Sequence, residues 1–277
     1  MTPVRPEPVS STVRAPLLRK TLRDNARGIA GWTLGIVALV AVQLSVFPSV
    51  SDTTSKIVDF AEAFPEVFRK IFRLEDYGSA VGYLSTELFS ASLPLIFIAV
   101  GVTWGARVAT DELEQGTSDV LYSLPLSRAH VMWVRLAAMV GVLIFLGVIV
   151  TVSLAIGGPI VDMSIAISRL AAASVSIALA GLIFGSLAAF VGAASGRRSV
   201  ALGIGLTVAI ACFVVYSLAP IVEVMDDVNP YNPMQWTIGA ESLKVGFDVW
   251  SCIFALATSI VPMIATIVAF DRRDLAA

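Results

Sequence analysis

Long apolar runs separated by short polar stretches make up most of the chain. Six runs contain no Asp, Glu, Lys or Arg, and these are residues 28–51, 88–106, 136–161, 170–196, 199–222 and 249–270. An α-helix needs roughly 20 consecutive apolar residues to cross the hydrocarbon core of a bilayer, and every run reaches about that length. The pattern therefore predicts an all-α membrane protein with six transmembrane helices.

The first apolar run has two interpretations. It ends in the small-x-small triplet Ser49-Val50-Ser51, which is typical of a site where a signal peptide is cleaved. However, the polar leader already covers residues 1–27, and the run is longer than the apolar region of a signal peptide, which is about 7–15 residues. These lengths favour an uncleaved transmembrane helix.

The composition excludes several classes of protein. Hydrophobic residues make up 57% of the chain and charged residues 14%, whereas soluble domains have about 45–50% and 25%. A net charge of −2 gives none of the basic excess that nucleic-acid binding requires. One histidine and two cysteines are too few for a zinc or iron–sulfur site built from soft ligands. Because the G-x-x-x-x-G-K-[ST] phosphate loop is also absent, we expect no enzyme activity, no cofactor and no nucleotide bound by this chain itself.

Charged residues between the runs are distributed unequally over the two sides of the membrane. Six crossings place both termini on one side, and the basic residues of that side are Arg5, Arg14, Arg19, Lys20, Arg23, Arg27, Arg107, Arg128, Arg135, Arg197, Arg198, Arg272 and Arg273. The other side has fewer than half as many, and these are Lys56, Arg69, Lys70, Arg73, Arg169 and Lys244. The positive-inside rule therefore predicts a multi-pass protein of the plasma membrane with both termini in the cytoplasm.

The N-terminal region divides into two parts. Residues 1–13 are rich in Pro, Ser and Val without periodicity, which predicts a disordered cytoplasmic tail, and residues 14–277 then form a single six-helix domain. Leu17, Leu18 and Leu22 are interspersed with Arg and Lys. This spacing predicts a short amphipathic helix at the cytoplasmic interface. The alternative is a plain basic flank that only sets the topology.

Two outer loops have helical patterns of their own. Residues 52–82 contain two apolar sets with charges between them, which predict two short amphipathic helices on the outer surface; a small lid packed over the bundle is the alternative. Before the sixth run, Asn232 suits a helix N-cap and is followed by a proline, and Gln235 completes an N-x-x-Q capping box. Gly246 provides a stop. The sequence predicts one helix over residues 233–245.

Glycines at four-residue spacing recur inside the apolar runs. The pairs are Gly31/Gly35, Gly101/Gly105, Gly181/Gly185 and Gly192/Gly196. Because such pairs let helix backbones approach closely, we expect them to mark packing contacts, one of which could belong to an oligomer interface. The two halves of the chain show no internal repeat, which disfavours a secondary transporter.

The most informative polar segment lies between the second and third runs. It contains four acids, Asp111, Glu112, Glu114 and Asp119, on the side where basic residues are expected. One interpretation is a solvated acidic loop. The other is a short surface helix that docks on a partner.

The order of residues in this segment resembles that of a known family. Glu112-x-Glu114-x-Gly116-Thr117, followed by Leu121 and Leu124-Pro125-Leu126-Ser127-Arg128, is similar to the E-x-E-x-G-T…L…P-x-S-R pattern of type 2 ATP-binding-cassette (ABC) exporter permeases. The resemblance implies a cytoplasmic coupling helix between the second and third transmembrane helices, which contacts an ATPase subunit. The residues that it implies for this coupling are Glu112, Glu114, Gly116, Thr117, Leu121, Pro125 and Arg128.

Two charged residues lie at the outer depth of the membrane. Glu87 falls about two turns into the second transmembrane helix, and Arg169 lies at a similar depth at the start of the fourth. Ionisable residues inside a span are candidates for function. Both are therefore candidate residues of the substrate path, where they could form an ion pair. The alternative is that both snorkel to the outer headgroups.

These patterns support one leading function and two alternatives. The resemblance implies the transmembrane subunit of an ATP-driven exporter, paired with a second permease copy as a homodimer or paralogous heterodimer, while a separate subunit binds ATP. Apolar walls favour a hydrophobic or amphipathic substrate, such as an antibiotic, another drug or a lipid-like molecule. A membrane scaffold or immunity protein that does not transport is the first alternative. An intramembrane enzyme is the second and has little support, because no run contains a histidine and Glu87 stands alone.

Overall fold

The computed structural model describes residues 14–52, 79–115, 128–239 and 241–271, and all regular structure within these ranges is helical. In chain order the elements are α1 (Arg14–Asp24), α2 (Ala26–Asp52), α5 (Ala80–Leu84), η3 (Ser85–Ser92), α6 (Leu93–Gln115), α8 (Arg128–Gly157), η4 (Gly158–Val161), α9 (Ile167–Ser195), α10 (Arg198–Leu218), α11 (Glu223–Val228), η5 (Asn229–Tyr231), α12 (Pro233–Thr237), α13 (Ser242–Val245) and α14 (Val249–Asp271). The predicted tail over residues 1–13 and the helices predicted within residues 53–78 lie outside the described residues.

Six helical stretches are long and apolar enough to cross a bilayer. They are Ala26–Val50, Ala80–Asp111, Ala129–Val161, Ile167–Ser195, Arg198–Leu218 and Val249–Asp271. Each contains or closely overlaps one of the charge-free runs of the sequence. The prediction of six transmembrane helices is therefore confirmed, and the chain is a multi-pass membrane protein.

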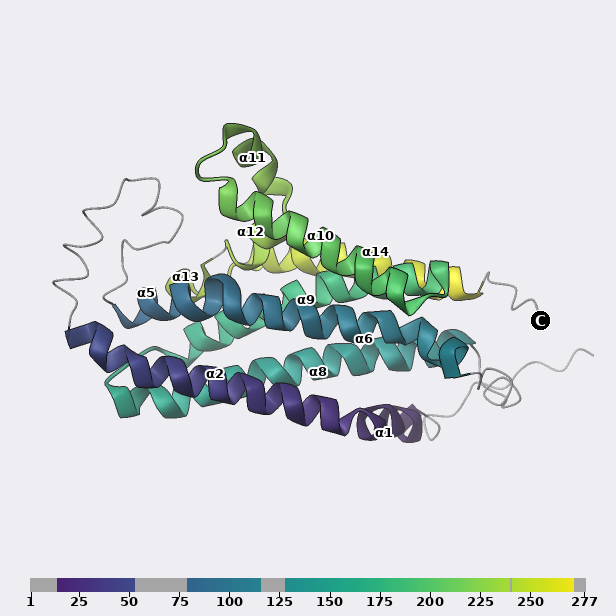
Figure 1. The fold of residues 1–277 in the computed structure, drawn as a ribbon, viewed down its shortest axis with the longest axis horizontal. Helices are drawn as coiled ribbons and strands as arrows, with labels where there is room; N and C mark the ends of the chain where they lie inside the picture. The colour runs from purple at the N-terminus through teal and green to yellow at the C-terminus, as the bar shows by residue number, and fades with distance from the viewer. Residues whose placement is uncertain (1–13, 53–78, 116–127, 240, 272–277) are drawn as a thin grey trace, which may run out of the picture.

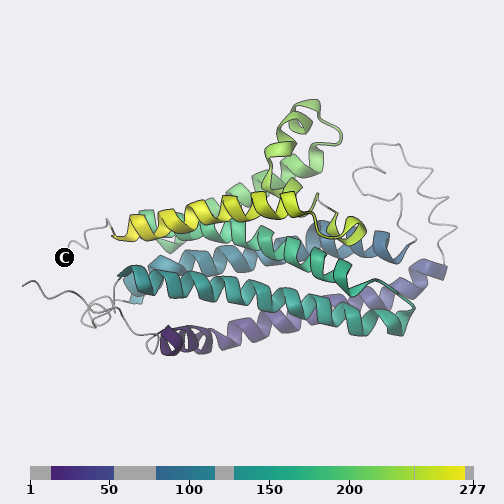
Figure 2. The same cartoon turned by 180° about the vertical axis from the view of Figure 1, so that it is seen from behind.

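The long helices run side by side along one axis, with α1 and the end of α14 at the same end of the bundle (Figure 1 and Figure 2). α9 occupies the centre, where it packs against α6, α8, α10 and α14. Within its most apolar stretch, 72% of the residues of α9 are buried, against 17% in α2 and 22% in each of α10 and α14. α9 is thus the core helix, and α2, α10 and α14 present most of their surface outward.

Glycines bring α6 and α9 into direct backbone contact. A Cβ added at Gly101 would overlap the carbonyl oxygen of Gly181, and one added at Gly105 would overlap that of Gly185. Only a residue without a side chain fits such a crossing. The close packing predicted for these two glycine pairs is confirmed.

The other two glycine pairs have different roles. Gly31 and Gly35 lie on α2, where an added Cβ would meet no atom within 4 Å, so they make no close helix contact within the described part of the chain. Gly192 faces α6, where its Cβ would lie 3.3 Å from the carbonyl oxygen of Ala106. Gly196 follows α9 with a left-handed φ of 67° and ends the helix. Spacing alone therefore does not distinguish an inward from an outward glycine pair.

The connection between α10 and α14 differs from the prediction of one helix over residues 233–245. α12 and α13 are separate short helices, and Glu241 between them has a left-handed φ of 45°. The turn places Ser242 Oγ 2.6 Å from Ser176 Oγ of α9, in a buried contact. This tertiary contact outweighs the local helical pattern. Gly246 ends α13 as predicted.

Asn232 caps α12 as predicted, but Gln235 does not complete the capping box. Asn232 Oδ1 accepts from the backbone N–H of Met234 at 3.1 Å, and its Nδ2 donates to the Cys212 carbonyl of α10 at 2.8 Å. The backbone N–H of Asn232 already donates to the Asn229 carbonyl at 2.9 Å. Gln235 Oε1 therefore accepts from Asn229 Nδ2 instead, at 3.1 Å.

α1 is the amphipathic helix predicted at the N-terminus, but its apolar face meets protein. Leu18 and Leu22 are half-buried and pack on the hydrophobic core, and α1 contacts α8. Arg19, Lys20 and Arg23 are exposed. The basic face of α1 is thus turned away from the bundle.

Candidate functional site

The acidic segment begins on α6 itself. Glu112 and Glu114 lie in the last turn of α6, which runs without interruption from Leu93 to Gln115, and Arg128 is the first residue of α8. α6 and α8 pack against each other, so the segment joins neighbouring helices. The other residues predicted for coupling lie outside the described residues, and they are Gly116, Thr117, Leu121 and Pro125. The coupling helix stays a prediction.

The helical conformation at this point separates the two glutamate positions. Glu112 and Glu114 both belong to α6. Successive residues of an α-helix are rotated by about 100°, so positions two apart are rotated by about 200°. The two positions therefore lie on opposite faces of α6, and one flat partner surface can meet only one of them.

Two arginines connect α6 to its neighbours just before the acidic segment. Arg107 Nη1 donates to Asn25 Oδ1, in the turn between α1 and α2, at 2.6 Å. Asn25 Nδ2 in turn donates to the Thr21 carbonyl of α1 at 3.0 Å. Arg135 of α8 donates from Nη1 to the Val108 carbonyl of α6 at 2.9 Å. This end of α6 is thus joined to α1 and to α8 by charge-assisted hydrogen bonds, which are among the stronger ones.

Asn25 is a residue whose role the sequence does not indicate. The sequence contains one signal for a structural role: an Asn between an amphipathic helix and an apolar run is typical of a residue that ends a helix. Nothing in the sequence pairs it with Arg107, which lies far along the chain. The pairing follows from the packing of the helices.

At the opposite end of the bundle, Glu87 lies in a π-helical stretch. η3 (Ser85–Ser92) interrupts the second transmembrane helix between α5 and α6, and Glu87 is half-buried within it. π-helical turns are rare and are frequently found at functional sites. One α-helical turn earlier, Tyr83 is buried and its Oη donates to Gln43 Oε1 of α2 at 2.9 Å. The irregular stretch is therefore anchored to α2.

Arg169 is exposed in the first turn of α9. Within the part of the chain that the structure describes, it forms no ion pair with Glu87. Both residues are predicted at a similar depth, but depth alone does not place them on facing surfaces.

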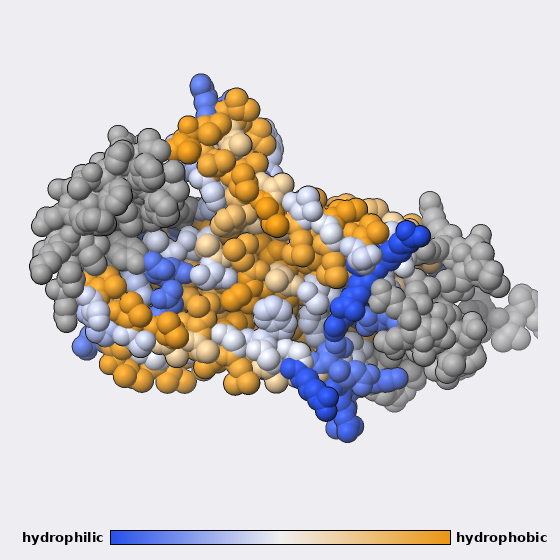
Figure 3. Space-filling view, in the orientation of Figure 1, coloured by the Kyte–Doolittle hydropathy of each residue, from blue (hydrophilic) through white to orange (hydrophobic). Residues whose placement is uncertain are grey.

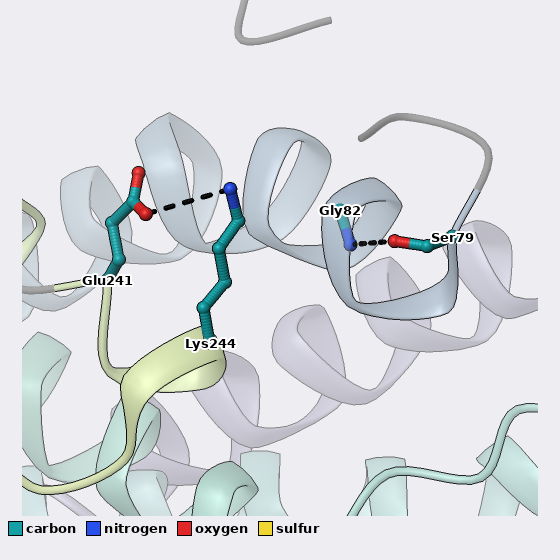
Figure 4. A network of polar contacts seen from close by, with 4 residues as sticks. All are labelled: Ser79, Gly82, Glu241 and Lys244. Atoms are coloured by element: carbon teal, nitrogen blue, oxygen red, sulfur yellow. Dashed lines mark hydrogen bonds and ion pairs between the residues drawn. The ribbon is translucent and has the colours of Figure 1, made fainter. Parts of the chain in front are cut away.

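Polar contacts accompany the packing of α12 and α13 against the bundle. Ser242 of α13 and Ser176 of α9 are both buried, and their hydroxyls are hydrogen-bonded. Lys244 Nζ of α13 lies 3.6 Å from Oε2 of Glu241, the residue before α13, and Figure 4 shows this pair beside α5, whose N-terminus is capped by Ser79. α13 packs against both α5 and α9. This end of the bundle thus has α13 packed next to the π-helical stretch.

An apolar groove with a volume of about 530 Å³ opens between α8, α9 and α14. Aliphatic side chains make up most of its lining, together with Cys252 of α14. The hydroxyls of Thr151 and Ser174 also line it and bond to each other at 2.8 Å. A mostly apolar groove with a few polar atoms suits an apolar ligand. Neither Glu87 nor Arg169 belongs to its lining.

Comparison with known proteins identifies one family. Its sequence model, described as ABC-2 family transporter protein, matches residues 15–275. That range includes all six membrane helices and the whole acidic segment. No curated protein sequence matches the chain.

Proposed function

Because the chain belongs to the ABC-2 transporter family, as the membrane permease of a type 2 ABC transporter, we propose that it exports a hydrophobic or amphipathic compound from the cell. The compound is an antibiotic, another drug or a lipid-like molecule. A separate ABC ATPase subunit supplies the energy, and two permease copies, identical or paralogous, form the path. Both termini and the acidic segment lie in the cytoplasm, where that ATPase binds.

The observation that carries the proposal is the continuity of α6. The acidic segment begins in the last turn of this helix, and α6 packs at backbone contact on the core helix α9 through Gly101 and Gly105. An ATPase that pushes on the segment therefore moves α6 and α9 as a unit. Movement of this unit against the outer helices opens the path to one side of the membrane and closes it to the other.

The surfaces of the bundle support the nature of the substrate. The groove between α8, α9 and α14 is apolar and lies within the membrane-spanning helices, so a hydrophobic compound can reach it from the bilayer without crossing water. A polar substrate would lack hydrogen-bond partners there, and burying its polar groups would be costly.

The proposal is tested by purifying the tagged permease from its own cells and identifying the proteins that accompany it. We expect an ABC ATPase to co-purify and its ATP turnover to rise with lipophilic dyes. Reconstituted vesicles should then move such a dye only when ATP is present. A scaffold or immunity protein would bind no ATPase whose turnover depends on it, and that result would exclude the exporter.

The predicted orientation can be tested separately with single cysteines in a Cys212→Ser, Cys252→Ser background. Cysteines placed after Pro8 and at Ala277 should be protected from a membrane-impermeant maleimide in intact cells. Cysteines at Glu62 and Asp227 should be labelled. Labelling of either terminus in intact cells would show that the orientation is wrong.

Glu87 is expected to affect transport if it belongs to the substrate path. Glu87→Gln keeps the size of the side chain and removes its charge, so substrate-stimulated ATP turnover should change several-fold while the protein still inserts and assembles. Glu223→Gln, on the exposed outer helix α11, is the matched control and should behave as the unmodified protein. If both variants are indistinguishable from the unmodified protein, Glu87 only snorkels to the outer headgroups.

A further inference from the structure

Basic side chains gather at the end of the bundle where α1 lies. They come from α1, from the first turn of α2, from α6 and from the start of α10. We call this set the basic band, and its members are Arg19, Lys20, Arg23, Arg27, Arg107, Arg197 and Arg198. Hydrophilic atoms are concentrated at this end of the bundle, whereas apolar atoms cover much of the remaining described surface in the same view (Figure 3).

The elements that carry the basic band are in contact with one another. Arg107 of α6 is bonded to Asn25, which lies between Arg23 of α1 and Arg27 of α2. On the other side, α6 and α10 meet around Gly192 of α9, whose added Cβ would lie 3.4 Å from Thr110 of α6 and 3.6 Å from Ala201 of α10. The helices that carry the band are therefore neighbours at this end of the bundle.

The positive charge of the band is only partly balanced by the protein. The acids at this end are Asp24 on α1 and Asp111, Glu112 and Glu114 at the end of α6, whereas Arg19, Lys20, Arg23, Arg27 and Arg197 are all exposed. The guanidinium Nε atoms of Arg107 and Arg198 are shielded from solvent and have no hydrogen-bond partner among the described residues. Removing a cation from water costs free energy, and a nearby anion offsets part of that cost.

The band lies at the depth where a helix leaves the hydrocarbon core. Arg107 is four residues before the end of the second membrane span, and Arg198 is the first residue of the fifth. α1 directly precedes the first span. At this depth the side of the bundle faces lipid headgroups, and clusters of Arg and Lys beside a span are typical of anionic-lipid binding.

We propose that the basic band is a binding site for anionic phospholipid, whose headgroup phosphates are bound by the exposed basic residues of α1 and by the neighbouring arginines of α2, α6 and α10. Arginine suits this role because its planar guanidinium can donate two parallel hydrogen bonds to one phosphate. A lipid bound here contacts α1 and α6 at once, and so stabilises the contact that the hydrogen bond from Arg107 to Asn25 makes between them. The proposal requires neither the direction of transport nor an ATPase.

The test uses the full-length protein in neutral detergent. It is titrated with phosphatidylglycerol that carries a fluorescent acyl chain, and with phosphatidylcholine that carries the same label. We expect tighter binding of phosphatidylglycerol, with a preference that falls as salt is added. The triple variant Arg19→Gln, Lys20→Gln, Arg23→Gln should lose about fivefold in phosphatidylglycerol affinity for each charge removed.

Two controls separate lipid binding from other effects. The charge-conserving double variant Arg19→Lys, Arg23→Lys should keep most of the preference, and Arg169→Gln, at the opposite end of the bundle, should keep all of it. Equal binding of both lipids by the unmodified protein, or an undiminished preference in the triple variant, would overturn the proposal. A triple variant that keeps the preference but no longer co-purifies an ATPase would assign the band to the ATPase instead.

Discussion

Gly101→Ala is expected to destabilise the helix bundle by about 1–3 kcal/mol or more, which is the usual cost of overpacking a core. The added Cβ would overlap the carbonyl oxygen of Gly181, a backbone atom that cannot move aside without displacing α9. Because α9 packs against four other membrane helices, such a displacement disturbs the whole bundle. The measurement is thermal unfolding of the purified protein in detergent, where we expect a clear fall in Tm.

Gly203→Ala is the matched control for this change. Gly203 also lies in a membrane helix, but its added Cβ would meet no atom within 4 Å. Alanine favours a helix over glycine by about 1 kcal/mol, so this variant should be neutral or slightly stabilised. If Gly101→Ala and Gly203→Ala shifted Tm by the same amount, the backbone contact between α6 and α9 would not be a determinant of stability.

The membrane helices could be predicted because their signal is carried by each segment alone. A run without charges must cross the bilayer or be buried, whatever its neighbours are. The N-cap at Asn232 could also be predicted from its own segment, because its Oδ1 accepts from a backbone N–H only two residues away. Elements whose stabilising contacts are local can be read from the sequence.

The features that the sequence did not predict depend on contacts between distant segments. The break between α12 and α13 accompanies the hydrogen bond from Ser242 to Ser176 of α9. The role of Asn25 depends on Arg107, which reaches it only when α6 lies beside the α1–α2 turn. The π-helical stretch around Glu87 likewise has no signature in the residue pattern. Serine, asparagine and glutamate occur in many loops, so residue type alone does not reveal these partners.

α6 links the acidic segment proposed for coupling to the π-helical stretch that contains the candidate residue Glu87. At one end it carries the acidic segment and the bond from Arg107 to Asn25, and at the other it continues from the π-helical stretch that contains Glu87. Between them it lies on the core helix at Gly101 and Gly105. A force applied to the acidic segment therefore has a continuous helix through which it can reach the opposite end of the bundle.

Alanine substitutions at Glu112 and Glu114 are expected to have unequal effects on assembly with the ATPase. Both residues belong to α6, and positions two apart lie about 200° apart around the helix, so a single partner surface meets one of them. A carboxylate paired with a cation inside an interface costs about 2–5 kcal/mol to remove. An exposed carboxylate contributes about 0–1 kcal/mol. One of Glu112→Ala and Glu114→Ala should therefore abolish ATPase binding or coupling, while the other stays close to normal.

A third variant separates docking from the fold of the segment. Gly116→Leu adds a bulky side chain directly after α6, at a position where a glycine allows close approach of another backbone. We expect it to uncouple ATP turnover from export without preventing membrane insertion. The three variants are compared by the amount of co-purified ATPase and by ATP-dependent dye export in vesicles. Normal behaviour of all three would identify the segment as a solvated acidic loop, and the ATPase would then have to engage another surface of the permease.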